Sequence, residues 1–191
     1  SAAGKFPEES VRYMCQIAEE AEANIDYTAF FKLHASQITH GVASSVAFSS
    51  VSTACQIGAK AIFVFTETGH TGALVSRLRP PIPIIALTNN LKAYYQMAVN
   101  WGLIPIYSES FGSTGEAFNI ICDYALEHNI LTVGDNVVVT AGTLFGVSGS
   151  TNMMMVESIG NVLVRGTDGY GELVAGKITI LHTPEEDSGN E

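Results

Sequence analysis

The segment Thr66-Glu67-Thr68-Gly69-His70-Thr71 concentrates side chains that suit an anion. Its threonine hydroxyls and the ring of His70 are hydrogen-bond donors, and Gly69 lets the backbone come close to a ligand. The segment follows the apolar run 61–65 and opens a helical pattern, so helix N–H groups point toward the same place. We therefore expect a loop that holds a phosphate group, with the Glu67 carboxylate turned toward solvent because it would repel the phosphate.

Threonine and glycine also occur at the start of ordinary helices, so a simple helix cap is the alternative interpretation of this segment. A second glycine-rich loop, Ala141–Thr151, follows a later apolar run. It either clamps the ligand together with the first loop or is a flexible connection. The second-loop residues that we expect at the ligand are Gly142, Thr143, Gly146, Ser148 and Gly149. Arg77 and Arg79 suit the carboxyl end of the first loop's helix better than a ligand contact.

Short apolar runs alternate with helical patterns between residues 60 and 140, which is typical of parallel βαβ units. This alternation predicts an α/β fold: a three-layer, parallel-rich sheet with helices on both faces. Ser113 and Glu116 have the spacing of a capping box. The expected strands are Ala61–Phe65, Ile84–Leu87, Ile104–Tyr107 and Val137–Thr140, and the expected helices are Thr71–Leu78, Leu91–Asn100 and Ser113–Asn129.

Pro7 suits the first position of an amphipathic helix, and the small residues of Gly41–Ile57 indicate a closely packed one. After Gly142 the pattern predicts a β-rich C-terminal portion without helical crossovers. Its strands are expected at Met153–Ser158, Val162–Arg165 and Lys177–Leu181. The acidic end, 183–191, is expected to be disordered.

The composition of the chain excludes several classes of function. The 191 residues, 47% of them apolar, can bury one core, and the formal charge of −10 argues against nucleic-acid and anionic-membrane partners. No apolar stretch is long enough for a membrane helix and no secretory leader is recognisable, so we expect a cytoplasmic protein. Cys15, Cys55 and Cys122 are expected to be reduced and buried, and no spacing of cysteine and histidine predicts a metal site. No catalytic motif is found, so no catalytic residue is predicted.

Four blocks resemble the C-terminal domain of a bacterial-type pyruvate kinase. They are Ala59–Pro80, Pro83–Thr88, Gly134–Gly142 and Gly149–Asn152, and the similarity covers roughly residues 1 to 160. Ala2–Pro7 resembles the stretch that leads into the final helix of that family's catalytic barrel. The resemblance implies three regions: 1–25 as the end of the barrel and the first helix, 26–158 as the α/β domain, and 159–191 as the start of an extra C-terminal segment with an acidic tail.

The resemblance implies a regulatory domain of a transferase that moves a phosphoryl group from phosphoenolpyruvate to ADP, giving pyruvate and ATP in glycolysis. Catalysis, with Mg and K, belongs to the family's barrel, so none is expected from this chain alone. The implied partners are the barrel of the same chain, other subunits of a tetramer, and an allosteric sugar-phosphate or nucleotide-monophosphate effector at Thr66–Thr71. Ser113–Asn129 and Ala141–Thr151 contain no Lys or Arg for a second phosphate, which favours a monophosphate.

Two other functions remain open at this point. In the first, the domain serves only for oligomerisation and binds no ligand. In the second, Gly69–Arg77 resembles a phosphohistidine motif, and His70 accepts a phosphoryl group as a nucleophile.

Overall fold

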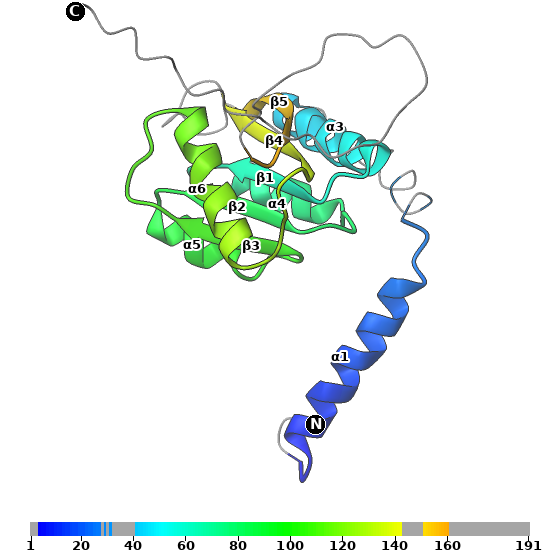
Figure 1. Ribbon diagram of the computed structural model, residues 1–191. Coiled ribbons are helices and arrows are strands. Elements are labelled where there is room, and N and C mark those ends of the chain that lie inside the picture. The colour runs from blue at the N-terminus through cyan, green and yellow to red at the C-terminus, as the bar shows by residue number, and fades with distance from the viewer. Residues whose placement is uncertain (1–3, 28, 30, 32–40, 143–150, 161–191) are drawn as a thin grey trace, which may run out of the picture. The chain divides into compact units, whose positions relative to one another are not determined.

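The computed structural model describes residues 4–27, 29, 31, 41–142 and 151–160 (Figure 1). The contacts divide the chain after Asn161, and the second unit, Val162–Glu191, lies outside the described residues. The helices are α1 (Pro7–Ala23), α3 (Val42–Ile57), α4 (His70–Arg77), α5 (Leu91–Met97) and α6 (Thr114–Glu127). The strands are β1 (Ala61–Phe65), β2 (Ile84–Thr88), β3 (Leu103–Tyr107), β4 (Asn136–Gly142) and β5 (Thr151–Ser158).

The strands form one sheet in the order β3-β2-β1-β4-β5. The first four are parallel, and β5 runs antiparallel to β4 at the edge. Every residue of β1 and β2 is buried, because helices cover both faces of the central strands. The predicted α/β fold with a parallel-rich sheet between helices is confirmed.

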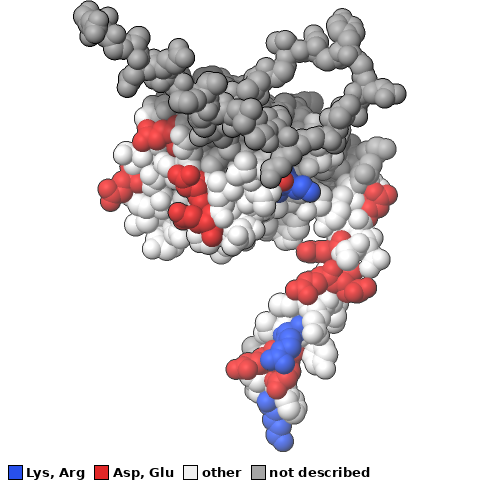
Figure 2. Space-filling model, in the orientation of Figure 1, with Lys and Arg blue, Asp and Glu red and all other residues white. Residues whose placement is uncertain are grey.

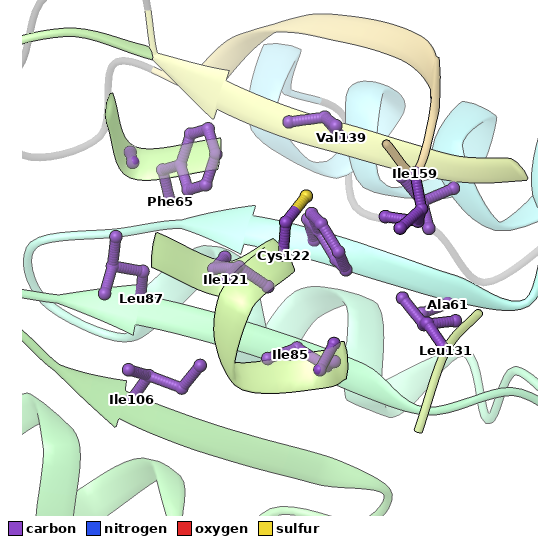
Figure 3. Packing of buried hydrophobic residues seen from close by; sticks show 14 of the residues in the cluster. Ala61, Phe65, Ile85, Leu87, Ile106, Ile121, Cys122, Leu131, Val139 and Ile159 are labelled. Atoms are coloured by element: carbon purple, nitrogen blue, oxygen red, sulfur yellow. The ribbon is translucent and has the colours of Figure 1, made fainter. Parts of the chain in front are cut away.

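One face of the sheet packs against α6. Phe63, Ile85 and Val139, from three neighbouring strands, belong to one buried cluster with Ile121 and Cys122 of this helix. Figure 3 shows Ile85 and Val139 on the strands beside these two helix residues. The opposite face packs against α3 and α4. There, small residues of α3 bring the helix close to the strands, as the sequence of this segment predicted. The buried residues of this second core are Ala47, Val51, Ala54, Ala59, Ile62, Val64, Val75, Ile84, Ala86, Met97, Leu103 and Val138.

The helix ends follow from local hydrogen bonding. Ser113 accepts the Glu116 N–H at 3.2 Å, which confirms half of the expected capping box. The Glu116 carboxylate accepts the N–H of Gly112 at 2.8 Å rather than that of Ser113. Asn90 caps α5 by accepting two N–H groups of its first turn.

The expectation that all three cysteines are buried was wrong for two of them. Cys15 and Cys55 are exposed, and only Cys122 is buried. Cys15 lies on α1, and α1 contains no buried residue, so its apolar stripe is exposed. Periodicity identifies an apolar face but does not show whether another element covers it.

The C-terminal prediction is confirmed in part, because β5 corresponds to the strand expected at Met153–Ser158. The strands expected at Val162–Arg165 and Lys177–Leu181, and the acidic end, lie outside the described residues. None of the helices in the described part of the chain is long and apolar enough to cross a membrane.

Candidate functional site

The chain reverses its direction of travel across the sheet between β1 and β4. From β1 it proceeds through α4 to β2 and through α5 to β3, and α6 then returns it to β4 on the other side of β1. In open α/β sheets the carboxyl ends of the strands at such a switch point form a crevice where ligands bind. Thr66–Thr71 follows β1 directly and Gly142 ends β4, so both predicted loops start at this edge.

Gly69 sets the entry into α4. Its φ of 79° is left-handed, and a Cβ at this position would lie 2.9 Å from Cγ of Met97, so both the conformation and the close packing require glycine. Gly69 is the N-cap residue of α4 and has no side chain to accept a first-turn N–H, and none of the described side chains is recorded as a cap there. The first-turn N–H groups of an α-helix have no intrahelical partner and carry the positive end of the helix dipole. They are the strongest feature of an anion site in this loop.

Two buried threonine hydroxyls hold the loop in shape. Oγ1 of Thr66 accepts the Gly69 N–H at 3.1 Å, and Oγ1 of Thr88 donates to the Glu67 carbonyl at 3.2 Å. Thr88 ends β2 beside β1, so the neighbouring strand braces the loop. Thr88 was not predicted as a site residue. Thr88 could have been predicted as a site residue, because it is a polar residue at the end of an otherwise apolar strand and lies at the same edge of the sheet as the loop.

Thr71 lies in the first turn of α4 and is 3% exposed. Its hydroxyl is 2.5 Å from that of Thr151, the first residue of β5, which is 6% exposed. Thr151 was expected at the end of the second loop, and in the structure it contacts the segment Thr66–Thr71. Thr68 and His70 are exposed, so their side chains are accessible from solvent.

The expectation that the Glu67 carboxylate points toward solvent was wrong. The residue is partly buried, and its Oε2 is fully buried without a hydrogen-bond partner among the described residues. A buried carboxylate oxygen without a partner is costly, and its charge opposes an anion nearby. The loop therefore combines attractive backbone dipoles with one repulsive side chain.

Among the second-loop residues that were expected at the ligand, the structure describes Gly142, which is half-buried. Thr143, Gly146, Ser148 and Gly149 lie outside the described residues. Arg77 is in the last turn of α4, at the end opposite to the phosphate loop, where a cation favours the helix dipole. Acidic side chains outnumber basic ones on the sheet domain's face seen in Figure 2, so any anion site depends on local donors. The described residues contain no cluster of three potential metal ligands.

Comparison with known proteins identifies related chains. Residues 44–157 match the model of the family described as pyruvate kinase, alpha/beta domain. The chain is 38% identical to a pyruvate kinase of Clostridium acetobutylicum over 83% of this chain and 34% of that protein. It is 32% identical to a pyruvate kinase of Staphylococcus saprophyticus over 100% of this chain and 33% of that protein. The chain thus spans about a third of the length of these curated relatives.

Solved structures show the same similarity. The fold superimposes on a crystal structure of pyruvate kinase from Cryptosporidium parvum with a TM-score of 0.75 and 26% identity, covering 82% of this chain and 31% of the other. A second structure of the Cryptosporidium parvum enzyme, in complex with ADP, gives a TM-score of 0.72 and 27% identity over 82% of this chain and 32% of the other.

Proposed function

Because the chain belongs to the family of pyruvate kinase alpha/beta domains, we propose that it is the regulatory C-terminal domain of a pyruvate kinase and binds a phosphorylated effector at Thr66–Thr71. The observation that carries the effector site is the amino end of α4, which lies at the switch point of the sheet and which no side chain of the described residues caps. The whole protein, in this proposal, transfers a phosphoryl group from phosphoenolpyruvate to ADP. In this proposal the reaction, with its Mg and K, takes place in the barrel and not in this domain.

The exposed face of α1 supports an association with the barrel of the same chain. Val11, Tyr13, Met14 and Ile17 are 55 to 67% exposed on this helix. A run of large apolar side chains on one helix is typical of a surface that another element covers. The proposal includes assembly of the whole protein into a tetramer in the cytoplasm.

The effector is a monophosphate of a sugar or nucleotide in this proposal. Backbone N–H groups of the first turn of α4 would bind the phosphate, with the hydroxyl of Thr68 beside them. Neither α6 nor the segment 141–151 offers a Lys or Arg to a second phosphate. The rest of the ligand would therefore make neutral hydrogen bonds and van der Waals contacts.

The test is a titration of the 191-residue chain with ribose 5-phosphate, glucose 6-phosphate, AMP and fructose 1,6-bisphosphate. We expect at least one monophosphate to bind with a millimolar or lower Kd and to shift the backbone amide NMR signals of Gly69, His70 and Thr71. Thr68→Val should weaken binding. Thr114→Val, which removes a threonine hydroxyl from the first turn of α6, is the matched control and should bind as the wild type does.

Two outcomes would contradict the proposal. If none of the four ligands shifts these amides at millimolar concentrations while the chain is folded, the domain is a ligand-free oligomerisation module. If incubation with phosphoenolpyruvate places an acid-labile phosphoryl group on His70, the phosphotransfer function replaces effector binding.

A further inference from the structure

The hydroxyl pair of Thr71 and Thr151 connects helix α4 with strand β5, which is not adjacent to the strand that leads into α4. Thr71 belongs to α4, which follows β1, and Thr151 opens β5. Strand β4 lies between β1 and β5, so the bond reaches across the end of β4. The two residues are 80 positions apart in the sequence, and both are at least nine-tenths buried.

Thr140 is a second buried polar residue near this bond that the described residues leave without a hydrogen-bond partner. It lies in β4, paired with Val64 of β1 and Met154 of β5, and it is fully buried. Its hydroxyl has no partner among the described residues. Side chains alternate along a strand, so Thr140 shares the face of Val138, which packs in the same core as Val75 of α4. An unpaired buried hydroxyl thus lies on the α4 side of the sheet, close to its carboxyl edge.

The Thr71–Thr151 bond has two arrangements with different consequences for a phosphate. A threonine hydroxyl has one proton to donate and two lone pairs. If Thr71 donates to Thr151, its proton is used and the hydroxyl has none to donate to a phosphate oxygen. If Thr151 donates to Thr71, the Thr71 proton is free for a phosphate oxygen, and the two bonds in series strengthen each other.

We propose that Thr151 is a positioning residue of the phosphate loop, which holds the Thr71 hydroxyl so that its proton points to the bound phosphate. This inference rests on the proposed function, because it requires a phosphate at the loop. It adds that ligand binding also fixes the start of β5, the antiparallel edge strand of the sheet. The edge strand therefore responds to the state of a loop on the other side of β4.

The experiment compares Thr151→Val with Thr151→Ser in the 191-residue chain. Inorganic phosphate and ribose 5-phosphate are the probes, and the amide signals of Gly69 and His70 report binding. Valine keeps the shape but removes the hydroxyl, and we expect a loss of affinity of about fivefold to tenfold, as for one hydrogen bond. Serine keeps the hydroxyl and should restore most of the wild-type affinity.

A purely structural role of Thr151 would give a different result. Thr151→Val would then lower the midpoint of thermal unfolding and leave the affinity for both probes unchanged, which would overturn the inference while the proposed function stands. If the wild type binds none of inorganic phosphate, ribose 5-phosphate, AMP and glucose 6-phosphate, the inference about Thr151 and the proposed function both fail.

A second variant and a second measurement test the proposal even if the valine variant does not fold. Thr151→Ala also removes the hydroxyl, and it should lose affinity by a similar factor. In the wild type, saturation with ribose 5-phosphate should slow amide hydrogen exchange in β5 while leaving β3, at the opposite edge, unchanged. Equal exchange in β5 with and without the bound ligand would refute the coupling.

Discussion

Replacing Gly69 with alanine tests whether the entry of α4 is built around a missing side chain. A non-glycine residue in the left-handed region costs roughly 1–2 kcal/mol, and Gly69 has a φ of 79°. The new Cβ would also lie 2.9 Å from Cγ of Met97, and displacing this flexible side chain costs about 1 kcal/mol more. We expect Gly69→Ala to lower the free energy of unfolding by about 2–3 kcal/mol, or roughly 4–12 °C in Tm.

Gly58→Ala is the matched control for this prediction. Gly58 has a φ of 64° at the carboxyl end of α3, and a Cβ there would meet nothing within 4 Å. It carries the conformational cost without the clash, so we expect a loss of about 1–2 kcal/mol. Urea denaturation of both variants measures the difference. A loss for Gly69→Ala no larger than that for Gly58→Ala would refute the claim that α4 packs too closely on Met97 for a side chain.

Three further predictions concern a helix cap, a thiol and a carboxylate. Asn90→Ala removes the cap of α5 and should cost about 1 kcal/mol of unfolding free energy in urea denaturation; an unchanged midpoint would contradict the cap. Burial, assisted by Asp123, raises the pKa of Cys122 to about 12 from an ordinary value of 9.0. The unfolded thiol therefore ionises first, so stability should fall as the pH rises from about 9 to about 12, and Cys122→Ala should remove this part of the pH dependence. Glu67→Gln removes the negative charge beside the loop and should increase the affinity for inorganic phosphate in NMR titrations, whereas unchanged affinity would place the carboxylate too far away to matter.

Much of the fold could be predicted because its signals are local. The run Ala61–Phe65 is apolar throughout, as a central parallel strand requires, and the structure gives the same bounds. The position of Thr66–Thr71 at the carboxyl edge followed from the order of strand and helix alone. These features depend only on neighbouring residues, so the sequence contains them directly.

The contacts of the site could not be predicted in the same way. The Thr71–Thr151 bond depends on the register of β5 against β4, where the pairing shifts between Ala141 and Gly142. The burial of the Glu67 carboxylate depends on side-chain packing around the loop. Cys15 was wrongly expected to be buried because helical periodicity does not show which faces are covered.

The charge of the chain and the position of its cations explain what kind of anion site this fold can offer. The chain contains nine basic and nineteen acidic residues. Arg77 lies at the far end of α4, about 12 Å along the helix from its start. A phosphate at Thr66–Thr71 would therefore be held by neutral N–H and O–H donors and the helix dipole, against the field of the whole chain. Such donors are directional, so their energy depends on the geometry that Gly69, Thr88 and Thr151 impose. This dependence would make phosphate binding at the loop sensitive to small shifts of α4 and β5.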